Sequence, residues 1–146
     1  MIRAMKILSF SQLGSRLRQE DAFYAGGGDN NIFVICDGVG GNSGGGMAST
    51  FIIEFFVDEL KSFQNASVDD GELNLIFEKA SKELVEFSKS QPEHMAMATT
   101  VAIAWFTPNA LVISHLGDSR VYVIRPFINS YWRTKDHSLV QELYDS

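Results

Sequence analysis

Cysteine, clustered basic charge and long hydrophobic runs are all scarce in this sequence of 146 residues. The single cysteine, Cys36, allows neither an intrachain disulfide nor a zinc cluster, and its apolar neighbours predict a small buried side chain. Lys and Arg number 12 against 18 Asp and Glu, which argues against a nucleic-acid partner because phosphate backbones require a basic surface. No apolar run approaches the roughly 20 residues of a membrane span. We recognise no signal peptide, and therefore expect a cytoplasmic protein without a membrane partner.

Glycine, in contrast, is concentrated in one part of the chain. Nine of the 12 glycines lie between Gly26 and Gly46, and the rest of the sequence has ordinary globular composition with 45% hydrophobic residues. The composition of residues 26–31 predicts a hairpin turn. The glycines of residues 38–46 require another explanation, because they follow an apolar strand and precede a helix.

The order of predicted elements indicates an α+β fold with antiparallel sheets. The helices are consecutive and short turns join the strands, which is not the alternation that builds a parallel sheet. The apolar run at residues 32–36 predicts a strand that is buried on both faces and ends at Asp37. A capping-box-like pattern of Ser67 and Asp70 predicts the start of the second helix, and Pro92 lies beyond its end. We expect strands at residues 3–12, 22–25, 32–36, 98–106, 110–115, 121–124 and around 131–132, and helices at 46–63, from 67 and from 138.

Asp37 and the glycines after it are the most informative segment. A carboxylate at the end of a buried strand is costly unless its charge is compensated. A carboxylate beside a main-chain carbonyl that no Cβ obstructs is suited to Mg²⁺ or Mn²⁺. A plain glycine-rich turn capped by Asp37 explains the same residues. A phosphate cradle is disfavoured because the Lys-Ser/Thr of a P-loop is absent, and a dinucleotide site because the βαβ context is absent.

Two further acid-bearing segments could contribute to a site. Arg16 could bind a phosphate, and the adjacent Glu20 and Asp21 repel each other unless a cation lies nearby; alternatively, all three are solvated loop charges. Asp118 lies in a turn between apolar strands, either as a capping residue or as another carboxylate facing a metal ion. A serine-hydrolase site at Ser119 would need His137 and an orienting acid such as Asp136, but no nucleophile-elbow pattern is present.

Five short motifs, in order from residue 16 to residue 138, resemble those of the metal-dependent serine/threonine protein phosphatases of type 2C. Gln19 replaces the usual Asn of the first motif, and Ala98 replaces the usual Gly of the third. The motifs are R-L-R-Q-E-D-A at residues 16–22; D-G-V-G-G at 37–41 with Gly45, Ala48 and Ser49; A-T-T at 98–100; G-D-S-R at 117–120 with Tyr122; and T-K-D-H-S at 134–138.

The resemblance implies an α-β-β-α sandwich of two packed antiparallel sheets flanked by helices, with two or three Mn²⁺ or Mg²⁺ ions. By position, Asp37 and the Gly38 carbonyl would bind the metals, and Glu20 and Asp21 would hold metal-bound waters. Asp118 matches the acid of a third, weaker site, and Arg16 would bind the substrate phosphate. The implied function is hydrolysis of phosphoserine and phosphothreonine in signalling phosphoproteins by a metal-bound water. Some members have a candidate general acid, histidine, where this chain has Val39, so the leaving group would be protonated from elsewhere, such as by water.

The family domain continues past the last of these motifs, and two later aspartate-bearing motifs are absent. We therefore expect residues 1–146 to be a single type 2C-like phosphatase domain, truncated before the last metal-ligand motifs and incomplete at the C-terminus. Three interpretations remain open. The chain is a piece of an active phosphatase, a short relative that acts as a binding or regulatory module with little catalysis, or a chain that self-associates through unpaired sheet edges.

Overall fold

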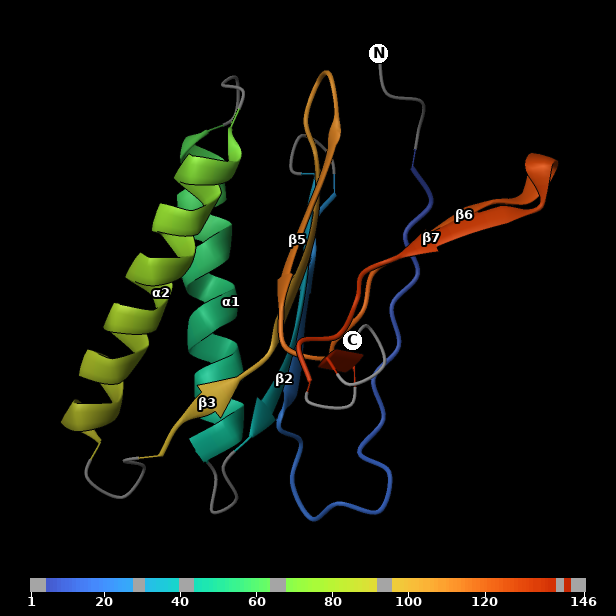
Figure 1. Cartoon of the computed structure of the whole chain (residues 1–146). Helices are drawn as coiled ribbons and strands as arrows, with labels where there is room; N and C mark the ends of the chain where they lie inside the picture. Colours follow the sequence, from blue (N-terminus) through green and yellow to red (C-terminus); the bar gives the residue numbers. More distant parts are fainter. Residues whose placement is uncertain are drawn as a thin grey trace.

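In the computed structural model, two helices lie on one side of a five-stranded antiparallel sheet (Figure 1). The structure describes residues 5–27, 31–39, 44–63, 68–91, 96–138 and 141–142. The strand order is β1-β2-β4-β5, and β3 also pairs with β2. The strands are β1 (Asp21–Ala25), β2 (Ile32–Val39), β3 (Ala98–Thr99), β4 (Val101–Phe106) and β5 (Leu111–Leu116). The predicted α+β class with antiparallel pairing is confirmed.

The helices cover only one face of this sheet. Helix α1 (Gly44–Ser62) packs against β1, β2 and β3, and α2 (Asp70–Ser90) packs on α1. On β2 the side chains alternate, so that Val34 and Cys36 are buried beneath α1 while Ile35, on the opposite face, is 53% exposed. The expectation of a strand buried on both faces is therefore wrong, because no second layer covers the far face within the described residues.

Strand β2 also continues past Cys36, where we expected it to end. Asp37 pairs with Asp21 of β1, and Gly38 pairs with Thr99 of β3. These neighbours supply hydrogen-bond partners beyond the apolar run, and a strand continues for as long as its backbone is paired. Asp37 consequently lies inside a strand, with its side chain on the face opposite the helices.

The second helix begins at a different cap from the one we expected. Asp69 is the N-cap residue and accepts a hydrogen bond from the Glu72 backbone N–H at 2.8 Å, while the Glu72 carboxylate accepts one from the Asp69 N–H at 3.0 Å. This is a complete capping box with glutamate at its third position, which stabilises the helix start more fully than Ser67 with Asp70 would. Ser67 and Pro92 lie outside the described residues.

Two of the predicted strands differ in the structure. Residues 5–12 form no strand, because no other described strand pairs with them, although they run beside the open face of the sheet (Figure 1). The predicted strand at residues 98–106 is divided into β3 and β4 at Thr100. There the Thr100 N–H donates to the Asp37 carbonyl oxygen at 2.9 Å, and the Thr100 hydroxyl accepts from the Asp37 N–H at 3.0 Å.

A separate hairpin projects from the sheet, as Figure 1 shows at the right. It consists of β6 (Tyr122–Arg125) and β7 (Ser130–Arg133), joined by the short helix η2 (Pro126–Ile128), and it confirms the predicted strands in this region. After it, Glu142 N–H donates to the Ser138 carbonyl oxygen at 3.0 Å, as a helical turn from Ser138 requires. Neither α1 nor α2, within the described residues, combines the length and apolar content that a membrane-spanning helix needs.

Candidate metal-binding site

Two carboxylates, Asp21 and Asp37, lie side by side at the centre of the candidate site. They are direct cross-strand partners in the antiparallel pair of β1 and β2. Side chains opposite each other in such a pair project from the same face of the sheet, and like charges at that separation repel. The antiparallel register therefore brings together two acids that are 16 positions apart in the sequence.

The pKa of Asp37 is raised above its ordinary value of 3.8. The first cause is partial removal from water, followed by the charge and hydrogen bonding of Asp21 and then the charge of Asp118. Arg16 acts in the opposite direction, since its positive charge lowers the pKa of Asp37. Three of the other predicted site residues thus lie close enough to Asp37 to alter its pKa, although the four residues come from three separate parts of the sequence.

Glu20 and Gly38, the other two predicted site residues, are joined by the backbone. The Gly38 N–H donates to the Glu20 carbonyl oxygen at 3.1 Å. A Cβ on Gly38 would lie 2.1 Å from the Gly45 carbonyl oxygen and 2.7 Å from that of Glu20. Only glycine fits, because the atoms that would collide with a side chain belong to backbone. Glycine is needed here for a structural reason: without a side chain, the end of β2 can lie directly against the start of α1.

Arg16 lies at the outer edge of this group. Its guanidinium is 4.0 Å from the Glu20 carboxylate, and its side chain is 80% exposed whereas that of Glu20 is 19% exposed. An exposed guanidinium beside a carboxylate cluster can bind an anion that approaches from solvent. This placement agrees with the predicted phosphate-binding role, which stays a prediction.

A pocket of about 470 Å³ opens beside the carboxylates. Asp21, Asp37 and Ser119 line one part of it, and the rest is lined by the open face of the sheet and residues 7–12 of the N-terminal segment. The acids are therefore accessible to a ligand of moderate size.

The donor set suits a hard divalent cation only in part. Carboxylate oxygens of Asp21 and Asp37 and a main-chain carbonyl at Gly38 are ligands that Mg²⁺ and Mn²⁺ prefer. Among the described residues, however, no group of three or more His, Cys, Asp or Glu side chains is arranged to hold a metal ion. The pKa of Asp37 is raised first by its partial burial and then by Asp21 and Asp118, and a cation bound beside these carboxylates would oppose the effect of their charges.

The alternatives to a metal site lose support from the contacts. The Ser119 hydroxyl lies 2.6 Å from the hydroxyl of Thr100, and Asp136 is paired with Arg120, so neither residue makes the contacts that a serine-hydrolase triad requires. Cys36 is fully buried, and burial raises the pKa of its thiol to about 12, which confirms a packing role.

Thr99 and Thr100 are site residues whose role we did not predict. Both side chains contact the backbone of Asp37: the Thr99 hydroxyl donates to its carbonyl oxygen at 3.0 Å, and Thr100 accepts from its N–H. The A-T-T motif is visible in the sequence, but only the pairing of β2 with β3 shows what it contacts.

The comparisons with known proteins all indicate one family. A family model described as "Protein phosphatase 2C" matches residues 11–132. The serine/threonine phosphatase stp of Listeria monocytogenes is 31% identical over 115 residues, covering 77% of this chain and 45% of that protein. A putative protein phosphatase of Mycoplasma pneumoniae is 30% identical over 118 residues, covering 75% and 45%. The chain thus spans less than half the length of these curated relatives.

Solved structures agree with this result. The Mycobacterium tuberculosis phosphatase PstP superposes with a TM-score of 0.75 at 28% identity, over 89% of this chain and 53% of that one. A structure of the PstP catalytic domain in complex with two manganese ions gives the same TM-score and identity. Stp1 of Staphylococcus aureus superposes with a TM-score of 0.70 at 25% identity, over 98% of this chain and 59% of that one.

Proposed function

Since this chain belongs to the protein phosphatase 2C family, we propose that it hydrolyses phosphoserine and phosphothreonine in proteins with the help of Mn²⁺ or Mg²⁺. The observation that carries the proposal is the pairing of Asp21 with Asp37 on one face of the sheet, with Arg16 and Asp118 close enough to alter the pKa of Asp37. This arrangement combines acids for a cation with a guanidinium for a phosphate. The substrates would be phosphoproteins of a signalling system.

Each site residue has a definite role in this proposal. Asp37 and the Gly38 carbonyl would bind the ions, and Asp118 would bind a further, weaker one. Glu20 and Asp21 would accept hydrogen bonds from the waters around them. Divalent ions held by these residues would lower the pKa of a bound water, which favours its nucleophilic hydroxide form, and would neutralise charge on the phosphate. Arg16, through its exposed guanidinium, would orient the phosphate next to the acids.

One observation favours the alternative function of a binding module with little catalysis. The described residues do not by themselves assemble three acidic or imidazole ligands around one point. A chain with this site would bind a cation weakly and bind phosphorylated partners through Arg16 without rapid turnover.

Hydrolysis of p-nitrophenyl phosphate with and without Mn²⁺ tests the proposal. We expect slow, Mn²⁺-dependent turnover by the 146-residue chain, and none above background for Asp37→Asn. The matched control is Asp58→Asn, which removes an exposed carboxylate on α1 that pairs only weakly with Lys61 at 3.7 Å.

The outcomes separate the two functions. Turnover that persists in Asp37→Asn contradicts the metal site, and fast turnover lost in Asp37→Asn contradicts the expectation of weak activity. Absence of turnover, together with binding of a phosphothreonine peptide that Arg16→Ala abolishes, supports the binding module.

A further inference from the structure

The T-K-D-H-S motif lies next to the turn that carries Asp118. Residues 134–137 follow the projecting hairpin, and residues 117–121 precede it, so the two segments meet at the base of the hairpin. The His137 N–H donates to the Gly117 carbonyl oxygen at 2.9 Å, and the Thr134 N–H donates to that of Val121 at 3.1 Å. In return, the Thr134 hydroxyl accepts from the Val121 N–H at 3.1 Å. Both ends of the turn are therefore bonded to the same segment.

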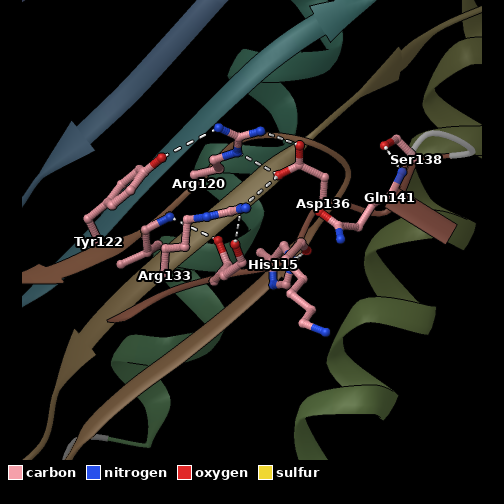
Figure 2. A network of polar contacts seen from close by, with 10 residues as sticks. His115, Arg120, Tyr122, Arg133, Asp136, Ser138 and Gln141 are labelled. Carbon is pink, nitrogen blue, oxygen red and sulfur yellow. Dashed lines mark hydrogen bonds and ion pairs between the residues drawn. The ribbon is translucent and has the colours of Figure 1, made fainter. Parts of the chain in front are cut away.

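The strongest contact between the two segments is the ion pair of Arg120 and Asp136 (Figure 2). The guanidinium donates two hydrogen bonds of 2.6 Å, one to each carboxylate oxygen, and Arg133 lies 3.8 Å away on the other side. The Asp136 side chain is only 13% exposed, and the hydrogen bonds from Arg120 lower its pKa. Two parallel hydrogen bonds between planar groups fix the relative orientation of Arg120 and Asp136 as well as their distance. A single exposed ion pair fixes neither firmly.

Asp118 lies between these contacts. On its other side, Ser119 lies 2.6 Å from the Thr100 hydroxyl, which in turn accepts from the Asp37 N–H. Gly117 has a φ of +103°, and a Cβ there would lie 2.7 Å from Thr100 Cγ2, so the turn also packs tightly on β3 and β4. The backbone around Asp118 is thus fixed from both directions, and Asp118 is close enough to Asp37 to raise its pKa.

We propose that residues 134–137 form a positioning segment for Asp118, and that the Arg120–Asp136 ion pair is its principal contact. In this role Asp136 acts only through the turn, which it orients so that Asp118 stays close to Asp37. The segment therefore determines how tightly the acidic site binds a divalent cation. The expected effect on cation binding rests on the proposed function. The claim that residues 134–137 hold the turn in place does not.

Titration of the 146-residue chain with Mn²⁺ by isothermal calorimetry tests the metal part. We expect Asp136→Asn to weaken Mn²⁺ binding about tenfold, as loss of an outer partner of a metal ligand typically does. The control is Glu86→Gln on α2, which removes an exposed ion pair in which the Glu86 carboxylate lies 2.7 Å from Lys89 Nζ. This variant should leave the Mn²⁺ affinity unchanged. Arg120→Lys keeps the charge but loses the paired geometry, and should give an intermediate loss.

A double variant distinguishes positioning from general stability. If Asp136 acts through Asp118, then Asp136→Asn should weaken Mn²⁺ binding no further once Asp118→Asn is present. Full additivity of the two effects on affinity, or an unchanged affinity in Asp136→Asn, overturns the proposal.

Amide hydrogen exchange of the metal-free chain separates this inference from the proposed function. In Asp136→Asn and Arg120→Lys we expect faster exchange at the Val121 and His137 amides, both of which donate across the two segments, than in the parent protein. The Ile103 amide of central strand β4 should be unchanged. If the parent chain binds no Mn²⁺, the proposed function fails, yet the exchange rates still decide the positional claim. Unchanged exchange at Val121 and His137 overturns it.

Discussion

At the scale of single residues, Asp37 is placed where its charge is unfavourable unless something binds there. Its carboxylate is partly withdrawn from water and lies near Asp21 and Asp118. An acid whose pKa is higher in the folded than in the unfolded chain lowers stability at every pH above that raised value. This loss of stability therefore shrinks as the pH falls through the raised pKa of Asp37, and it disappears below the ordinary value of 3.8. Such a cost is common where a site must accept a ligand.

Asp37→Asn should accordingly raise the melting temperature of the metal-free protein at neutral pH. The difference from the parent protein should shrink as the pH is lowered through the raised pKa of Asp37, because protonation then removes the same charge. With Mn²⁺ the order should reverse, since only the parent gains stability from binding. Thermal unfolding in EDTA and in Mn²⁺, at several pH values, measures both effects. A variant that is less stable than the parent in EDTA at neutral pH would contradict the electrostatic account.

Gly38→Ala is the second prediction at this scale. The added methyl group would overlap the carbonyl oxygens of Gly45 and Glu20, which cannot move without displacing α1 or the loop before β1. We expect a loss of at least about 2 kcal/mol in the free energy of unfolding, measured in urea. Gly27→Ala is the matched control, because its nearest contact would be Ile7 Cδ1 at an ordinary 3.7 Å. Equal stability of the two variants would show that the approach of β2 to α1 is not tight.

At the scale of elements, α2 depends on its own cap more than on the sheet. It packs on α1, and its exposed side carries most of its polar residues. The reciprocal hydrogen bonds of Asp69 and Glu72 satisfy two backbone donors that the helix start leaves unpaired. The start of α2 is therefore decided locally.

Asp69→Ala should cost about 1 kcal/mol of stability, the usual effect of removing an N-cap acceptor. Asp70→Ala, the neighbouring acid in the first turn, should cost only a few tenths because it loses a favourable charge near the helix start and no cap. Urea unfolding followed by circular dichroism measures both. Similar losses in the two variants would mean that charge, rather than the hydrogen bond of the cap, stabilises this end.

At the scale of the whole molecule, much apolar surface is left uncovered. Phe23 and Ile35 on the open face of the sheet, and Phe127, Tyr131 and Trp132 on the hairpin, are all exposed, with Phe127 fully so. Contiguous exposed apolar surface promotes association, and β1 and β5 are edge strands that are each paired on one side only within the described sheet.

We therefore predict self-association of the 146-residue chain that increases with concentration in sedimentation velocity. Phe127→Lys combined with Tyr131→Lys should shift the distribution towards monomer without lowering the melting temperature, because neither side chain is packed. Leu75→Lys on α2, a residue that is 66% exposed, provides the control on the opposite side of the molecule. A parent protein that stays monomeric at high concentration would contradict self-association through these surfaces.

Elements whose signals are local could be predicted from the sequence. The apolar stripe of α1 and the short strands of the projecting hairpin follow from hydrophobic periodicity, which depends on neighbouring residues. The turn predicted at residues 26–31 lies partly outside the described residues. The motifs likewise identified Asp37, Gly38 and Asp118 as candidate site residues. Local signals also misled: Ile7, Leu8 and Phe10 have the composition of a strand, but a strand requires a partner, and residues 5–12 have none among the described strands.

Which of the site residues come into contact depends on the tertiary structure. The register of β1 on β2 places Asp21 beside Asp37, and the meeting of the two ends of the hairpin places Asp136 against Arg120. It also decided that β2 is buried on one face alone and extends to Val39. These outcomes depend on pairing and packing between segments far apart in the chain, and no pattern within a single segment carries that information.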